Sequence, residues 1–116
     1  MTTSAAYPNV QLLINNEWRD ARGGATMPVH NPADGSVIGT VAKATIADLD
    51  EALAAAAKGF TVWKNTPAFE RSKIMRAAAQ LLRERTDAIA HVMTLEQGKP
   101  LGEAKVEIGI DRKSVV

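Results

Sequence analysis

Residues 66–100 constrain the fold more than any other part of the chain, because they carry helix start signals, periodic apolar positions and a stop signal. Thr66 is predicted as a helix N-cap, with Pro67 at the first helical position, where its missing N–H costs nothing. Thr86 offers a second cap within the stretch. Gly98 is predicted as a left-handed helix terminator, with a proline two residues later. The stretch therefore predicts a packed pair of amphipathic helices.

Two short β-units are predicted ahead of these helices. The apolar run at 10–14 and the return at 17–19 flank Asn15-Asn16, a pair that accepts the positive φ of a tight hairpin turn. A second turn at 31–35 combines a proline with Asp-Gly and leads into a strand at 37–42. Both units are too short to form a complete sheet on their own.

A first helix follows the second β-unit. Thr45 with Asp48 three residues later resembles a capping box, with Asp in the Glu/Gln position, and the apolar period changes from 2 to 3.6. Its apolar side chains form one stripe that consists of Ile46, Leu49, Leu53, Ala56, Ala57 and Phe60. The charged residues Asp48, Asp50, Glu51 and Lys58 are expected outside this stripe.

The predicted order is two β-units followed by three helices, the last beginning after Pro100. The predicted elements do not alternate strand and helix as a complete dinucleotide-binding fold would. We therefore expect much apolar helix surface to lack a partner and the isolated chain to be poorly soluble.

Composition excludes several classes of function. The chain has 116 residues, with 14 basic against 13 acidic side chains and a net charge of +1, so it carries no strong field for nucleic acid or membranes. Residues 1–9 are predicted to be a flexible leader without the features of a secretory signal, and a cytoplasmic location is expected. The sequence contains no cysteine, which excludes disulfides, thiolate metal sites and thiol-based covalent catalysis by this chain.

Several candidate motifs have simpler structural interpretations. His30 and His91 lie far apart in sequence without zinc-ligand spacing, so they are interpreted as a strand-end residue and a solvated or rim residue. Gly23-Gly24 lacks the strand-turn-helix context of a phosphate loop, and Gly98-Lys99 precedes a proline where a P-loop has a hydroxyl. A plain turn is favoured for Gly23-Gly24, and a helix C-cap is favoured for Gly98-Lys99.

A basic cluster is the remaining candidate surface. It is interrupted by acidic residues and has no aromatic platform, so a solvated face with local ion pairs is favoured over a nucleic-acid site. Its members are Arg71, Lys73, Arg76, Arg83 and Arg85.

Four motifs together resemble the N-terminal part of the NAD(P)-dependent aldehyde dehydrogenases. They are LINNEW at 13–18, NPADGSVIG at 31–39, the alanine-rich helix at 48–63 and LEQGKP at 95–100. Their order and spacing match the family, and the likeness runs from residue 12 to 109. FERS at residues 69–72 beside LEQGKP resembles the succinate-semialdehyde dehydrogenase branch most.

The resemblance implies an α/β fold of which residues 10–109 are the N-terminal segment, with an incomplete open sheet. It implies an intact homo-oligomeric enzyme that oxidises an aldehyde to the acid with NAD or NADP. The family's catalytic cysteine, its general base and its nicotinamide-binding residues lie beyond the matched region. This chain alone is therefore predicted to be inactive, and a stand-alone helical protein-interaction module is the alternative function.

The resemblance also implies a structural monovalent cation. Carried over by position, its ligands are the carboxylate of Glu96 and the backbone carbonyls of Val29 and His30. Oxygen ligands suit a hard cation, although Glu replaces the Asp often found at this position.

Residues 110–116 depart from the family pattern. DRKSVV is also what one frame of a common sequencing-library adapter encodes, so we hypothesise that this tail is an artefact of sequence assembly. Genomic DNA that runs contiguously through these codons would exclude the hypothesis.

Overall fold

The computed structural model describes the backbone of residues 7–114 and the side chains of residues 7–110. Most of the predicted leader therefore lies outside the described residues, and of the predicted tail the backbone is described as far as Ser114, at the end of a helix. The chain forms two compact units, one of Tyr7–Val29 with Val37–Asn65, the other including His30–Ser36 and the chain from Thr66 onward. In the described part of the chain, no helix is both long enough and apolar enough to cross a membrane.

The first unit opens with the predicted hairpin. Strands β1 (Leu12–Ile14) and β2 (Glu17–Arg19) pair in antiparallel register. Asn15 and Asn16 connect them with φ angles of 51° and 64°. Asparagine tolerates this left-handed region better than other side chains do, so the predicted turn is confirmed.

A second two-stranded sheet holds β3 (Thr26–His30) and β4 (Val37–Ala42). Val10 lies beside β4 in a parallel bridge that the sequence did not predict. Its N–H donates to the Thr40 carbonyl at 2.8 Å, and its carbonyl accepts from the Ala42 N–H at 2.8 Å. The bridge joins the segment preceding the first hairpin to the second sheet.

Helix α1 (Ile46–Asn65) completes the first unit, and its start is a reciprocal capping box. The Asp48 N–H donates to the Thr45 hydroxyl at 3.3 Å, while the Thr45 N–H donates to Asp48 Oδ2 at 2.8 Å. The capping prediction is therefore confirmed. The sequence did not predict the burial of Asp48, whose side chain is only 1% exposed.

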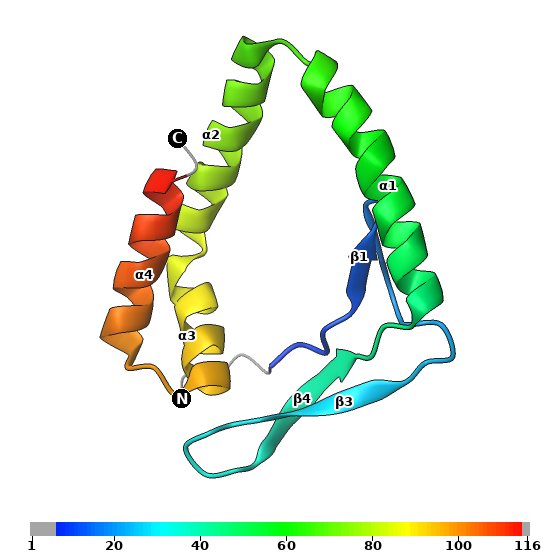
Figure 1. Cartoon of the computed structure of the whole chain (residues 1–116). Helices are drawn as coiled ribbons and strands as arrows, with labels where there is room; N and C mark the ends of the chain where they lie inside the picture. The colour runs from blue at the N-terminus through cyan, green and yellow to red at the C-terminus, as the bar shows by residue number, and fades with distance from the viewer. Residues whose placement is uncertain (1–6, 115–116) are drawn as a thin grey trace. The chain divides into compact units, whose positions relative to one another are not determined.

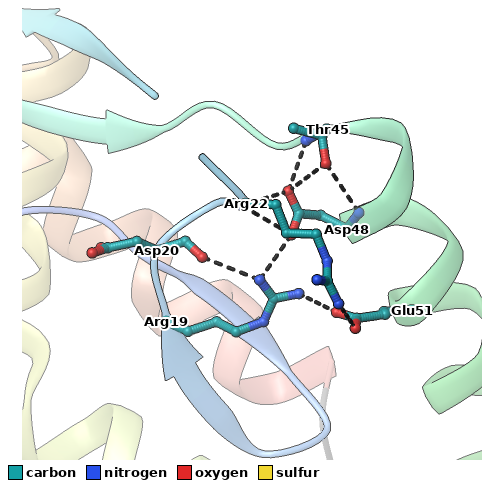
Figure 2. A network of polar contacts seen from close by, with 6 residues as sticks. All are labelled: Arg19, Asp20, Arg22, Thr45, Asp48 and Glu51. Carbon is teal, nitrogen blue, oxygen red and sulfur yellow. Dashed lines mark hydrogen bonds and ion pairs between the residues drawn. The ribbon is translucent and has the colours of Figure 1, made fainter. Parts of the chain in front are cut away.

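Asp48 is buried because the first hairpin supplies it with further donors (Figure 2). Arg19 Nη1 donates to Asp48 Oδ1 at 2.8 Å, and the Arg22 N–H donates to Oδ2 at 3.1 Å. Both guanidinium groups also pair with the carboxylate of Glu51, one helical turn further along. One carboxylate thus caps α1 and fixes β2 and the following loop against it.

The second unit contains α2 (Ala68–Glu84), α3 (Thr86–Gln97) and α4 (Leu101–Ser114). Helices α3 and α4 lie side by side (Figure 1). The buried core between them comprises Ala90, Ala104 and Ile108, with Ile89 and Met93 packed against it. The small alanines let the two helices approach closely.

The described residues form four helices, one more than the total of three predicted from the sequence. The pair predicted within residues 66–100 is confirmed, because α2 ends at Glu84 and α3 begins at Thr86. Helix α2 begins one residue later than predicted, with Pro67 in the cap position. The Thr86 hydroxyl does not cap α3 and instead donates to the carbonyls of Leu82 and Arg83 at 2.9 and 3.0 Å. Because the chain runs almost directly from α2 into α3, the Thr86 hydroxyl lies beside the last carbonyls of α2 and hydrogen-bonds to them.

Helix α3 ends as predicted at Gly98, which has φ 71° and donates its N–H to the Thr94 carbonyl at 2.9 Å. A Cβ atom at this position would lie 3.1 Å from Cγ of Pro32. Both the backbone conformation and the neighbouring ring therefore favour glycine.

The expected lack of partners for apolar helix surface is also confirmed. Large hydrophobic side chains on α1, α2 and α4 are exposed, among them Phe69 at 74% and Val106 at 64%. The buried hydrophobic residues are mostly alanines, so the described residues form only a small core.

We expect Gly98→Ala to lower the free energy of unfolding by about 1 kcal/mol or more, because alanine is strained at positive φ. Gly102→Ala is the matched control. A Cβ there meets no atom within 4 Å in helix α4, so alanine should stabilise by about 0.5–1 kcal/mol. Urea titration of the chain followed by circular dichroism measures both, and equal effects would contradict the prediction.

The Thr45 N–H, the Arg19 guanidinium and the Thr45 hydroxyl hold the pKa of Asp48 well below its usual range, against the opposing effect of burial. A depressed pKa means that the carboxylate stabilises the fold above about pH 4, and that this contribution is lost as the pH falls through the folded-state pKa. Asp48→Asn should therefore lower the melting temperature at neutral pH and weaken the loss of stability between neutral and strongly acidic pH.

Thermal melts of the chain across this pH range test the prediction. Asp50→Asn, at an exposed position of the same helix, is the control and should melt like the parent protein throughout. An Asp48→Asn melting curve with the parent's full acid sensitivity would show that this carboxylate does not link folding to pH.

Candidate functional site

A shallow hollow of about 600 Å³ lies between the first hairpin and helix α1. Its charged lining consists of Glu17, Arg19, Arg22, Glu51 and Lys58. The two arginines face carboxylates rather than open solvent, since both pair with Glu51 and one also binds Asp48 (Figure 2). Their positive charge is therefore neutralised within the protein, and the hollow has no free arginine pair with which to bind an anion.

The residues predicted to hold a cation lie at the ends of two elements. His30 is the last residue of β3, as expected for a strand-end residue, and its Nδ1 lies 3.3 Å from the Gly35 carbonyl oxygen. Val29 precedes it and is half-buried, whereas Glu96 is exposed in the last turn of α3. Within the second unit, the turn after His30 contacts the end of α3 near Glu96, because Pro32 lies against Gly98.

These residues do not form a cluster of metal-binding side chains. Among the described residues, no group of three or more histidine, cysteine, aspartate or glutamate side chains is arranged to hold a metal ion. The predicted site has a different composition, one carboxylate with two backbone carbonyls. It therefore stays a prediction.

The glycine motifs have the structural roles that the sequence favoured. Gly23 and Gly24 have φ angles of 82° and 72°, and the Gly24 N–H donates to the Ala21 carbonyl at 2.8 Å. The chain then enters strand β3, so these N–H groups do not open a helix as those of a dinucleotide-binding turn do. Gly98-Lys99 is the end of α3, and Lys99 pairs with Glu107 of α4.

The structure also identifies buried polar atoms that sequence reasoning missed. Nε of Arg71, Nε2 of His91 and Oγ1 of Thr94 are buried without a hydrogen-bond partner among the described residues. Arg71 was expected on a solvated face, and for its Nε atom that expectation is wrong, whereas the half-buried His91 agrees with the predicted solvated or rim residue. Helix packing buries them, and helical spacing alone does not say which polar atoms a neighbouring helix covers.

Lys73 and Arg83 of the basic cluster make the local contacts that were expected of a solvated helix face. Lys73 pairs with Glu70 at 3.5 Å, and Arg83 donates to Gln80 at 2.7 and 2.9 Å. Both contacts lie within α2, so they are local pairs of a helix surface.

The sequence matches the model of the aldehyde dehydrogenase family over residues 18–113. Among curated proteins, it is 49% identical over 98 residues to a glutarate-semialdehyde dehydrogenase from Pseudomonas putida. It is 45% identical over 98 residues to the succinate-semialdehyde dehydrogenase [NADP(+)] of Escherichia coli. Each match covers 84% of this chain and 20% of the relative, so the chain spans about a fifth of the length of these proteins.

The solved structures that this chain resembles likewise match it over only part of their length. An aldehyde dehydrogenase from Brucella melitensis biovar abortus matches with a TM-score of 0.91 and 42% identity, over 97% of this chain and 23% of its own. An NADP-dependent enzyme from E. coli matches with a TM-score of 0.89 and 41% identity, over 92% of this chain and 22% of its own. The predicted fold class is confirmed by these structures, and with the family match over most of its length the chain belongs to the aldehyde dehydrogenase family.

Proposed function

We propose that this chain is the N-terminal segment of an NAD(P)-dependent dehydrogenase that oxidises a semialdehyde, such as succinate semialdehyde, to the corresponding acid. The observation that carries the proposal is the identity of 43–49% over 98 residues to relatives named glutarate- and succinate-semialdehyde dehydrogenases. The substrates of these relatives share an aldehyde at one end and a carboxylate at the other. A cytoplasmic location and a homo-oligomeric intact enzyme belong to the same proposal.

The chemistry of the proposed reaction needs groups that this segment does not supply. When bound, a nicotinamide cofactor accepts hydride from the substrate carbon. The E. coli relative is named for NADP(+), which supports a nicotinamide cofactor in the intact enzyme. In the described residues, neither glycine turn offers helix N–H groups for a dinucleotide phosphate, and the sequence contains no cysteine. The residues of this segment thus act as framework for a reaction carried out elsewhere in the fold.

The purified 116-residue chain should not reduce NAD or NADP in the presence of succinate or glutarate semialdehyde. The absorbance of the reduced cofactor measures this, with an active semialdehyde dehydrogenase as the positive control. Aldehyde-dependent reduction by the chain alone would contradict the framework role and would require a mechanism without cysteine.

The alternative of a stand-alone interaction module has no support from the comparisons. Circular dichroism and size-exclusion chromatography separate the two functions. A monodisperse chain with a cooperative thermal transition would favour the module, and an aggregating or molten chain would favour the framework segment.

We further propose that the Glu96 carboxylate and the carbonyls of Val29 and His30 bind a monovalent cation. The chemistry of the donors supports this, because hard oxygen ligands suit such an ion. The contact between Pro32 and Gly98 supports it as well, since it brings the turn after His30 to the end of the helix that carries Glu96.

The chain should melt at a higher temperature in potassium or sodium chloride than in a bulky organic-cation chloride of equal ionic strength. Glu96→Gln should remove this difference because it removes the anionic ligand. Glu103→Gln, at an exposed position of the neighbouring helix α4, should retain it. The same cation preference in the Glu96→Gln variant would exclude the site.

A further inference from the structure

The turn between β3 and β4 contains Asp34-Gly35, the one place in the sequence where aspartate or asparagine directly precedes glycine. Both residues are exposed, and Gly35 has φ 74° with no atom within 4 Å of the place where a Cβ would lie. Because glycine has no side chain, its backbone nitrogen can reach the preceding carboxyl carbon without steric obstruction. The dipeptide can therefore react within the main chain.

The reaction open to this pair is closure of a five-membered succinimide ring. The Gly35 nitrogen bonds to the Asp34 carboxyl carbon, and the hydroxyl of the carboxylic acid leaves with the amide proton as water. The ring then takes up one water at either carbonyl, which returns aspartate or gives isoaspartate. One water is lost and one regained, so the reaction needs no oxidant, reductant or other reactant.

Three hydrogen bonds of the folded turn oppose ring closure. Asp34 Oδ1 accepts from the Ser36 hydroxyl at 2.7 Å and from the Ser36 N–H at 2.9 Å. These two donors hold the pKa of Asp34 below its ordinary value, which favours the carboxylate over the carboxylic acid that must lose its hydroxyl. The attacking nitrogen is also occupied, because the Gly35 N–H donates to the Asn31 carbonyl at 2.8 Å.

Further contacts close the turn around the reactive pair. The Asn31 N–H donates to the Ser36 carbonyl at 2.8 Å, and Asn31 Oδ1 accepts from the Ala33 N–H at 3.0 Å. Rotation of the Gly35 peptide toward the Asp34 carboxyl group would release its bond to Asn31. Ring closure therefore needs local opening of the turn.

We propose that Asp34-Gly35 is a site of spontaneous isomerisation to isoaspartate, and that the folded turn between β3 and β4 suppresses the reaction. Isoaspartate carries the main chain through its side-chain carbons, which lengthens the turn by one atom. The two backbone bonds between Asn31 and residues 35 and 36 no longer fit the lengthened turn. The product also presents a free α-carboxylate, the group that isoaspartyl methyltransferases esterify with S-adenosylmethionine. This class of repair enzyme is thus the partner that the modified chain would bind.

The test compares the reaction in the folded and the unfolded chain. The 116-residue chain is incubated at mildly acidic pH in buffer and, in parallel, in concentrated urea. Trypsin then releases residues 23–43 as one peptide, because Arg22 and Lys43 mark its two cleavage sites. Chromatography separates its two isomers, and methylation by an isoaspartyl methyltransferase with a labelled methyl donor quantifies isoaspartate. The product should form roughly tenfold or more slowly in buffer than in urea, because several hydrogen bonds must open first.

Ser36→Ala removes the hydroxyl donor and should raise the rate in buffer roughly threefold relative to the rate of the same variant in urea. Ser36→Thr is the matched control, since it retains the hydroxyl group and should keep the parent's ratio of the two rates. Asp34→Glu should give no product, because its longer side chain cannot form the five-membered ring. Circular dichroism should show the same helix content in all variants.

Equal rates in buffer and urea would overturn the proposal, whatever helix content the chain retains. Absence of isoaspartate at residue 34 in urea would also overturn it, as would equal rate ratios for Ser36→Ala and Ser36→Thr. The measurements use neither aldehyde nor nicotinamide cofactor. Their outcome is therefore independent of the proposed oxidation.

Discussion

The carboxylate of Asp48 is the interaction on which the first unit depends. It accepts hydrogen bonds from the cap of its own helix, from the Arg19 side chain and from the backbone of Arg22. A buried charge is tolerated only when its oxygens are well supplied with donors, and here the donors come from three separate segments. Loss of any one segment would leave the others facing an incompletely compensated charge, so helix α1 and the hairpin are coupled.

The second unit is held differently. Its core is a small group of alanines with one isoleucine, and its helices are joined end to end by a break at Arg85 and by the turn at Gly98. Ion pairs at the rim, Lys105 with Asp87 and Lys99 with Glu107, link α4 to α3 and to the turn. A core of this size buries little apolar area, which agrees with the large hydrophobic side chains left exposed on the described helices.

Local features of the sequence predicted local features of the fold. Asn15-Asn16, the Thr45–Asp48 pair and Gly98 each specify a backbone conformation within a few residues, and all three have the expected geometry. The burial of Asp48 was missed because it depends on Arg19, 29 residues away in sequence. The start of α3 was predicted at Thr86, but the predicted capping role of its side chain was wrong because its hydroxyl donates to carbonyls of α2.

The function was accessible from the sequence only through resemblance. Family motifs such as LEQGKP identified the lineage, and the absence of cysteine showed that the segment cannot perform thiol chemistry. The proposed cation ligands are carried over from the family, because backbone carbonyls such as those of Val29 and His30 have no sequence signature of their own. The buried atoms of Arg71 and His91 likewise depend on which helices meet.

The fully enclosed alanines of the second unit limit how this protein can change over evolution. Ala90 and Ala104 have no exposed surface, and both belong to the buried core that α3 and α4 share. A single added methyl group at either position has no free volume to occupy, so it must move one helix away from the other. Tolerated replacements at these two sites should thus be confined to residues no larger than alanine, even though most of the surrounding helix surface is open to substitution.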